Sequence, residues 1–286
     1  MTVTSDNLTA SIREVDGVRT AVIDTGEPSG ESVQPPLLLL HGSGPGVSAA
    51  ANWRPVLPSL SQTRRVIAPD QLGFGGTATG EPRTWGRQAW TRHALALMDE
   101  LGIETFDIIG NSMGGAIALS LAAERPPAVR RLVLMGSMGV AMALPQGLDT
   151  VWSYRPGMEN MREIIALFAY DRRLITDQLV EMRYGASAEP AVAKSWEAMF
   201  PEPRQRWVDD LALPGAELAQ VAQPTLMIHG RDDRVVPWKE SSGALLELLP
   251  DVRLHVLGNC GHWTMIEKTA EFLGVVEPFL SEARPG

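Results

Sequence analysis

The amino-acid sequence predicts an α/β fold in which helices flank a mostly parallel sheet, with a helical segment inserted before the last strands. Short apolar, β-prone runs alternate with helical periods over the first half of the 286-residue chain. The alternation stops between residues 139 and 214, where the periods are helical, and it returns after residue 214. A glycine-rich turn containing Ser112 lies between one expected strand and the helix that follows it. We therefore expect a core formed by residues 1–138 and 215–286 and a helical cap formed by residues 139–214.

The first elements form the edge and the centre of the expected sheet. Residues 12–25 are predicted to be an antiparallel hairpin at a sheet edge, because Asp16-Gly17 is a favoured two-residue turn between two β-prone runs. The apolar runs at 37–40 and 65–69 are uninterrupted, as expected of strands that are buried on both faces. A helix should follow, with Thr84 as its N-cap and Gly102 at its end.

The remaining core elements continue the alternation of strands and helices. A strand at 106–110 leads through the turn at Ser112 into a helix that stops before Pro126, and a strand at 132–136 comes next. After the cap, strands are expected at 225–228 and 254–257, with a helix at 240–249 between them and a last helix at 267–280.

The composition indicates a soluble globular protein, with 44% hydrophobic and 21% charged residues. A net charge of −9 disfavours nucleic acid as a partner. The polar N-terminus and the lack of an apolar run near the roughly 18 residues of a membrane span predict a cytoplasmic protein without a membrane partner. The single cysteine, Cys260, agrees with a reducing compartment. The five histidines are scattered without the spacing of a metal site, so we expect no bound metal.

The stretch around Ser112 is the predicted centre of the chemistry. Gly110-Asn111-Ser112-Met113-Gly114 is a G-x-S-x-G turn in the strand-turn-helix setting of a nucleophile elbow. Small residues in such an elbow let a strained turn pack closely, so that the serine hydroxyl stands clear of the backbone. The five letters alone are weak evidence, and a tight turn without a catalytic role is the alternative. The flanking strand and helix favour Ser112 as a nucleophile.

A serine nucleophile needs a base and an acid that orients the base, and the chain offers both after its last two strands. We assign His262, in the last of these loops, as the base. The other histidines lie inside expected elements or in crowded turns at strand ends: His41, His93, His229 and His255. The HG-x-x-D-x-x-V-P spacing assigns Asp233 as the acid, with its neighbour Asp232 as the alternative. The order Ser, Asp, His is that of α/β-hydrolases.

Two backbone N–H groups should form an oxyanion hole for the charge that develops during acyl transfer. Met113 follows the nucleophile and supplies one of them. The loop at 41–46, after an early strand, supplies the other, which we assign to Ser43. A plain glycine turn is the alternative for that loop.

Several segments together resemble the meta-cleavage product hydrolases, which are carbon–carbon bond hydrolases of bacterial aromatic degradation. In the core, the resemblance rests on residues 41–49, 52–53, 110–115 and 260–263. In the cap, residues 168–171, 174–176, 183–184 and 200–207 are similar to the branch that acts on ring-fission products of monocyclic, alkyl-substituted aromatics. The triad spacing is common to many α/β-hydrolases, whereas the glycine-rich loop with Asn52 and the cap segments are more specific.

The resemblance implies hydrolysis of a 2-hydroxy-6-oxohexa-2,4-dienoate to 2-hydroxypenta-2,4-dienoate and a carboxylic acid, without a cofactor. A carbanion is a poor leaving group, so the dienol must first become a ketone that accepts electrons. The residues that match family positions around the substrate are Gly42, Asn52, Asn111, Arg183 and Trp263. The planar guanidinium of Arg183 suits a carboxylate. A homodimer or higher homo-oligomer is expected, although the sequence does not itself define the oligomeric state.

Other functions stay open at this point. A carboxylesterase would use the same triad, but it has no use for Arg183 opposite Asn111. A ligand-binding protein without activity would not need an intact triad, and dehalogenases and epoxide hydrolases of this fold use a carboxylate nucleophile. Apolar cap side chains predict that small alkyl groups on substrate carbon C6 are preferred over phenyl: Phe168, Met182, Trp196 and Met199.

Overall fold

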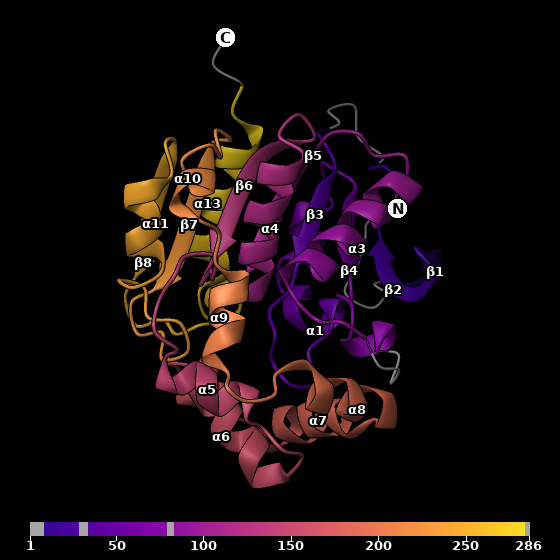
Figure 1. Ribbon diagram of the computed structural model, residues 1–286, viewed down its shortest axis with the longest axis vertical. Coiled ribbons are helices and arrows are strands. Elements are labelled where there is room, and N and C mark those ends of the chain that lie inside the picture. Colours follow the sequence, from indigo (N-terminus) through magenta and orange to yellow (C-terminus); the bar gives the residue numbers. More distant parts are fainter. Residues whose placement is uncertain (1–8, 29–33, 79–82, 284–286) are drawn as a thin grey trace.

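A computed structural model describes residues 9–28, 34–78 and 83–283 (Figure 1). Its centre is an eight-stranded sheet with the order β1-β2-β4-β3-β5-β6-β7-β8. The strands are β1 (Ser11–Val15), β2 (Val18–Asp24), β3 (Leu37–Leu40), β4 (Val66–Pro69), β5 (Phe106–Asn111), β6 (Val129–Met135), β7 (Thr225–Gly230) and β8 (Val252–Leu257). Strand β2 is antiparallel to β1 and β4, and every other neighbouring pair is parallel. The predicted α/β fold with a mostly parallel sheet is confirmed.

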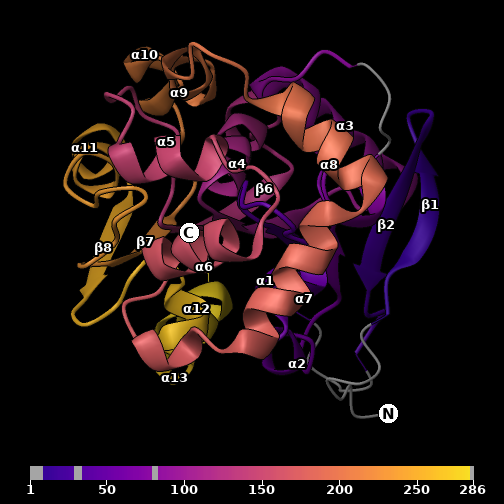
Figure 2. The ribbon, with the colours of Figure 1, turned by 90° about the horizontal axis from the view of Figure 1, so that it is seen from below.

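Helices cover both faces of the sheet. The core helices are α1 (Ala49–Trp53), α2 (Leu57–Leu60), α3 (Arg87–Glu100), α4 (Met113–Glu124), α10 (Gly215–Leu218), α11 (Ser242–Leu248), α12 (Thr264–Glu267) and α13 (Thr269–Ser281), with a 3-10 turn η2 (Gly75–Thr77). Figure 2 shows α3 and α4 on one side of the sheet and α2 and α13 on the other. A hydrogen bond of 2.6 Å from Ser59 Oγ to Glu277 joins α2 to α13. The short helices α1 and α2 were not predicted from the sequence.

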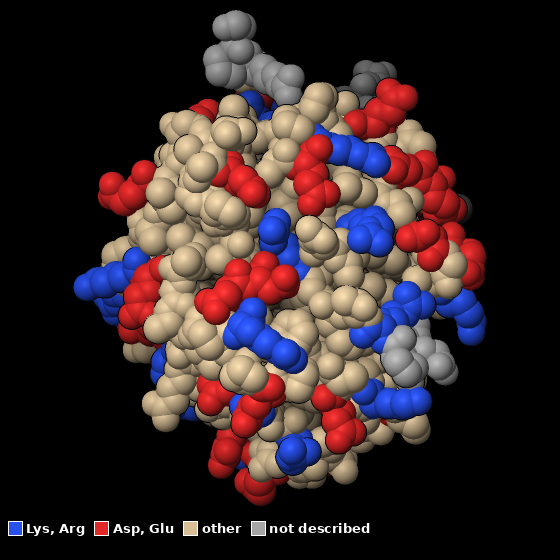
Figure 3. All heavy atoms as spheres, viewed as in Figure 1, with Lys and Arg blue, Asp and Glu red and all other residues tan. Residues whose placement is uncertain are grey.

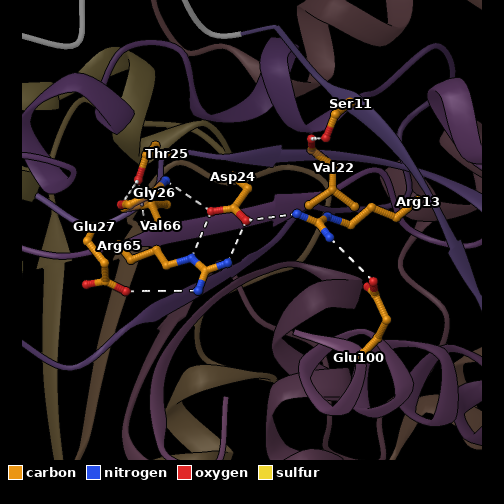
Figure 4. Close-up of polar contacts among 10 residues, drawn as sticks. All are labelled: Ser11, Arg13, Val22, Asp24, Thr25, Gly26, Glu27, Arg65, Val66 and Glu100. Carbon is orange, nitrogen blue, oxygen red and sulfur yellow. Dashed lines mark hydrogen bonds and ion pairs between the residues drawn. The ribbon is translucent and has the colours of Figure 1, made fainter. Parts of the chain in front are cut away.

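The predicted edge hairpin is formed by β1 and β2. Asp16 and Gly17 at its turn both have positive φ, 48° and 71°, as a two-residue hairpin loop of this kind requires. Figure 4 shows how Asp24, at the end of β2, is fixed from two sides. Arg65 donates two hydrogen bonds to its carboxylate, of 2.9 and 2.7 Å, and Arg13 approaches within 3.3 Å. These contacts hold the hairpin against the rest of the core.

The central strands are fully buried, whereas the last strand is half-buried. All four residues of β3 have no exposed surface, and all six of β5 are buried. Burial on both faces explains why these strands appear in the sequence as continuous apolar runs. Strand β8 alternates between half-buried and exposed residues, as an edge strand does. The fixed central strands provide the positions from which the functional loops start.

The start of α3 differs from the prediction. Thr84 is not its N-cap, because the helix begins at Arg87 after Gly86. The carboxylate of Asp210, on the distant helix α9 (Gln205–Leu211), accepts a hydrogen bond of 2.6 Å from Arg87 N. A cap supplied by a residue so far along the chain cannot be recognised from local sequence. The predicted end is confirmed, since Gly102 follows the helix in the left-handed region, with φ 65°.

The segment between β6 and β7 is helical in the described chain. It contains α5 (Gln146–Trp152), α6 (Met158–Phe168), the 3-10 turn η3 (Arg172–Leu174), α7 (Asp177–Ala188), α8 (Pro190–Met199) and α9. Helices α5 to α8 gather beyond one end of the sheet (Figure 1). The division of the chain at residues 139 and 214 stays a prediction.

Acidic and basic side chains are interspersed on the surface seen in Figure 3, and neither sign forms a continuous patch there. Over the described ranges, the model contains no helix that is both long and apolar enough to cross a membrane.

Candidate active site

Ser112 occupies a strained turn between β5 and α4. Its backbone has φ 55° and ψ −117°, a combination that residues other than glycine rarely adopt. A Cβ atom on Gly110 would collide with the carbonyl oxygen of Gly114, and one on Gly114 would collide with that of Leu40. The close packing predicted for the G-x-S-x-G turn is therefore present. Backbone strain of this kind is concentrated at functional sites.

Asp233 and His262 form a buried pair. Nδ1 of His262 lies 2.6 Å from Oδ2 of Asp233, and both side chains are almost fully buried. The other carboxylate oxygen, Oδ1, accepts hydrogen bonds from the backbone N–H groups of Val235 and Val236, at 2.8 and 2.9 Å. Burial alone would raise the pKa of Asp233, but its electrostatic interaction with His262 and hydrogen bonds from two histidines outweigh this effect. The pKa of Asp233 lies well below its usual range, so the carboxylate stays ionised.

The neighbouring Asp232 points elsewhere. Its carboxylate is half-buried and lies 3.4 Å from the backbone N–H of Cys260 and 3.5 Å from the guanidinium of Arg231. Its backbone N–H donates to the carbonyl oxygen of Cys260, at 3.0 Å. Asp232 therefore braces the loop before His262, while Asp233 contacts the imidazole.

His229 also contacts Asp233, although its sequence position did not indicate a role in the site. Its Nε2 lies 3.1 Å from Oδ2 of Asp233 and 2.8 Å from the carbonyl oxygen of Val236. Its Nδ1 lies 2.7 Å from Oγ of Ser242. The signal was present in the sequence, because His229 stands four residues before the assigned acid. Its position at a strand end had suggested a crowded turn and nothing more.

The guanidinium of Arg183, on α7, is buried without a carboxylate partner among the described residues. The side chain is 6% exposed, its Nη1 donates to the carbonyl oxygen of Gly46 over 3.4 Å, and its Nε has no partner. Burial lowers the pKa of Arg183 to about 10, which leaves it protonated at neutral pH. A buried charge without a counter-ion is unfavourable in the free protein, so this position favours an anionic ligand.

The other predicted binding residues differ in their contacts. Trp263 lies with its ring 5.9 Å from the Arg183 guanidinium carbon. Nδ2 of Asn52 is buried without a hydrogen-bond partner in the described part of the chain, whereas Nδ2 of Asn111 donates to the carbonyl oxygen of Met135 at 3.2 Å. Gly42 allows close approach, since a Cβ atom there would lie 3.0 Å from Cβ of Ser112.

The two predicted oxyanion donors come from two segments, the start of α4 and the loop after β3. Met113 is the first residue of α4, so its N–H points out of the helix end without an intrahelical acceptor. Ser43 belongs to the loop after β3, and its Oγ accepts a hydrogen bond of 3.0 Å from Nε1 of Trp152, on α5. This bond fixes the loop to the inserted segment, and no local sequence pattern indicates it.

A cavity, here called the inner cavity, brings most of these residues together. It is lined by Gly42, Ser43, Gly44, Val47, Asn52, Asn111, Ser112, Leu148, Val151, Phe168, Arg183, Val235, His262 and Trp263. Asp233 lies behind His262 and does not line it. The polar groups at Arg183 and Asn52 and the apolar side chains Leu148, Val151 and Val235 give the cavity two chemically different parts.

Of the four apolar cap side chains named from the sequence, one lines the inner cavity. Phe168 lines the inner cavity and stacks on His262, with ring centroids 5.5 Å apart. Met182 is 49% exposed, and Trp196 and Met199 are buried in the hydrophobic core outside the inner cavity. Helical periodicity identifies buried faces without showing which cavity they border, and the preference for small C6 groups stays a prediction.

The geometry suits nucleophilic acyl chemistry on an anionic substrate. A strained serine and a buried histidine on an ionised carboxylate are parts that such chemistry uses, and Met113 at the start of α4 offers a helix-end N–H next to the serine in the chain. In the described ranges, no group of three or more His, Cys, Asp and Glu side chains could hold a metal ion.

Comparison with known proteins gives related sequences over nearly the whole chain. Residues 35–269 match the family described as alpha/beta hydrolase fold. The chain is 48% identical to 2-hydroxymuconate semialdehyde hydrolase of Pseudomonas sp. (strain CF600), over 93% of this chain and 92% of that protein. It is also 48% identical to 2-hydroxy-6-oxo-2,4-heptadienoate hydrolase of Pseudomonas putida, over 86% of this chain and 89% of that one.

A solved structure agrees with these sequence matches. A serine-to-alanine mutant of a meta-cleavage product hydrolase from Pseudomonas fluorescens IP01, complexed with acetates, superposes with a TM-score of 0.92 at 45% identity. The alignment covers 96% of this chain and 99% of that one.

Proposed function

The chain belongs to the α/β-hydrolase family and, within it, to the meta-cleavage product hydrolases, and on that premise we propose how its own residues carry out the reaction. Members of this group are serine hydrolases that cleave a carbon–carbon bond, and this chain hydrolyses 2-hydroxy-6-oxohexa-2,4-dienoate-type ring-fission products to 2-hydroxypenta-2,4-dienoate and a carboxylic acid. We assign Ser112 as nucleophile, His262 as base and Asp233 as the acid that orients it.

One observation supports the binding mode above the others. The buried guanidinium of Arg183 has no carboxylate partner in the described chain, and it borders the same cavity as Ser112. The substrate carries a carboxylate at one end and the scissile ketone at the other. Arg183 therefore binds the carboxylate, with Asn52 and Trp263 beside it, while Ser112 meets the C6 carbonyl group.

The first chemical task is to make a leaving group. Protonation of C5 and loss of the 2-hydroxyl proton convert the dienol to a ketone, so that C5 is next to both C6 and the unsaturated 2-oxo system. When the C5–C6 bond breaks, its electron pair spreads through C4 and C3 to the 2-oxygen. The cation of Arg183 and the amides of Asn52 and Asn111 lie at this end and stabilise the negative charge.

The second task is attack on C6. Ser112 Oγ adds to the carbonyl carbon while His262 takes its proton, and the N–H groups of Met113 and Ser43 hold the oxyanion. Loss of the dienolate leaves an acyl group on Ser112, and the proton held by His262 neutralises the released dienolate. Neutral His262 then activates a water molecule, which releases the carboxylic acid and restores the serine.

Residues 139–214 act in this proposal as a cap that closes the cavity and sets its apolar end. Leu148 and Val151, on α5, and Val235, after β7, border that end. Trp152, also on α5, stacks on Phe200 with ring centroids 4.6 Å apart. A large C6 substituent would have to displace these packed rings, so hydrogen and small alkyl groups are preferred over phenyl. A cytoplasmic location and a homo-oligomer stay predictions.

The test is the loss of the visible absorbance of yellow ring-fission products that carry hydrogen, methyl, ethyl, isopropyl or phenyl at C6, measured side by side. We expect kcat/KM to be highest for hydrogen or a small alkyl group and at least about tenfold lower for phenyl, the discrimination that a restrictive apolar pocket supplies. Turnover of none of them would reject the function, and a phenyl substrate that is fastest would reject the assigned apolar end.

A further inference from the structure

A second space, here called the outer hollow, adjoins the inner cavity. It has an empty volume of about 500 Å³ and is lined by Ala51, Asn52, Leu174, Leu179, Met182, Arg183, Trp263 and Ile266. Asn52, Arg183 and Trp263 line both spaces and therefore stand between them. The remaining lining residues are apolar.

The outer hollow opens to solvent beside α7. Met182 is 49% exposed, and Leu174 and Leu179 are half-buried. Figure 2 shows α7 running beside α1 and α12, the two other helices that contribute to this lining. Ser112 and His262, by contrast, are only 3% and 2% exposed. A ligand that enters from the outer hollow must therefore pass the partition formed by Asn52, Arg183 and Trp263 to reach them.

A different surface hollow lies between α5, α6 and the loop after β7. Thr150, Leu167 and Arg234 are among its lining residues. This space, here called the far hollow, provides a control site for mutation. It borders the same inserted segment but shares no lining residue with the inner cavity.

We propose that the outer hollow is the passage through which the dienoate enters and leaves, and this rests on the proposed function. The apolar lining accepts the C6 end first. The carboxylate follows last and stops at Arg183, whose guanidinium borders both spaces. After cleavage the dienoate is the fragment nearest the partition, so it departs by the same route.

The test measures binding kinetics in the Ser112→Ala protein, which cannot cleave its ligand, with the C6-methyl ring-fission product as probe. Met182→Trp, added to this background, should lower both the association and the dissociation rate constants by about tenfold, with Kd changed less than about twofold. A narrowed passage slows both directions equally, whereas a lost binding contact changes Kd. Leu179→Trp is the second variant, in case Met182→Trp does not fold.

Thr150→Trp is the matched control, because it places the same bulk in the far hollow. It should leave both rate constants within about twofold of the background. Slower binding in Thr150→Trp and unchanged binding in both α7 variants would overturn the passage. A change in Kd with an unchanged association rate would also overturn it. If wild type does not turn over the probe, the proposed function itself fails.

A separate observation concerns His229. Its Nε2 faces two acceptors, Oδ2 of Asp233 and the carbonyl oxygen of Val236, at 3.1 and 2.8 Å. Acceptors on both sides require a proton on Nε2, so His229 donates to the oxygen that also faces Nδ1 of His262. On the other side of the ring, Nδ1 of His229 lies 2.7 Å from Oγ of Ser242, so both ring nitrogens are held.

We infer that His229 is a positioning residue for the reaction, which acts through Asp233 and does not touch substrate. Its N–H fixes the carboxylate plane, and the carboxylate in turn fixes the imidazole of His262. His229→Leu should lower kcat by about 10- to 100-fold with KM changed less than about twofold, because misplacement of the base affects chemistry and not binding.

Glutamine is the rescue variant, since its side-chain N–H₂ can replace Nε2–H. His229→Gln should recover at least about tenfold of the kcat lost in His229→Leu. His93→Gln is the control: His93 is also buried, 2.9 Å from Thr20, but lies on α3 away from the site, and kcat should stay near wild type. Equal kcat in the leucine and glutamine variants would show a merely structural role. An unaffected kcat in both would reject the inference while leaving the triad in place.

Discussion

The two halves of the candidate site, one around Asp233 and the other around Arg183, differ in how many of their polar groups have hydrogen-bond partners. Around Asp233, four N–H groups converge on two carboxylate oxygens, and the histidines that supply two of them are themselves held. Around Arg183, the buried donors Nε of Arg183 and Nδ2 of Asn52 have no hydrogen-bond partner among the described residues. The hydrogen bonds of the first half are complete in the free protein, whereas those of the second half are completed only when a ligand binds. The acid and base of the proposed triad are therefore positioned before substrate binds, whereas Arg183 and Asn52 keep donors that a substrate can use.

The largest expected effect lies in the completed half. Ser112→Ala should lower kcat by on the order of a millionfold, because the triad acts as a unit and the nucleophile has no substitute. Folding and ligand binding should persist, since the unfilled half is untouched, and thermal unfolding and dienoate titration would check both. More than about a tenth of the wild-type rate would reject the whole assignment.

The next effect separates the two neighbouring carboxylates. Asp233→Asn keeps the shape but places an amide against His262, so the imidazole loses its orienting charge and kcat should fall by roughly ten-thousandfold. Asp232→Asn is the matched control, and it should change kcat by less than about threefold because its carboxylate contacts backbone and Arg231. The reverse pattern would mean that the acid is Asp232.

A smaller effect is expected in the unfilled half. Arg183→Ala should lose about 2–4 kcal/mol of kcat/KM on a dienoate, because the substrate carboxylate is left without its charged donor. A neutral p-nitrophenyl ester has no carboxylate, so its hydrolysis should change by less than about threefold in the same variant. Equal losses on both substrates would make Arg183 a structural residue and would favour the carboxylesterase alternative.

The same contrast explains what could be predicted from sequence. Strands and helices of the core, the turn at Ser112 and the spacing that selects Asp233 over Asp232 depend on local patterns, which the sequence displays directly. Contacts between distant segments do not. Asp210 caps α3, Trp152 holds Ser43 and His229 supports Asp233, and each pairing exists only after the chain has folded. The position of Met199 and Trp196 outside the inner cavity could not be predicted for the same reason, since periodicity shows burial but not neighbours.

The smallest expected effect is on the free energy of unfolding, which should change in opposite directions when a residue beside Arg183 and a residue behind Asp233 are substituted. Asn52→Leu replaces a buried amide whose Nδ2 lacks a partner with an apolar side chain of similar size, and it should raise the free energy of unfolding by about 1 kcal/mol. Ser242→Ala removes the partner of His229 Nδ1 and should lower it by about 1 kcal/mol. Urea unfolding of both variants without ligand measures the difference. Because Asn52 gains its hydrogen bond only from the substrate, Asn52→Leu should also weaken dienoate binding while the protein becomes more stable. Destabilisation by Asn52→Leu would show that the amide is already satisfied in the free protein, and the contrast between the two halves would then be lost.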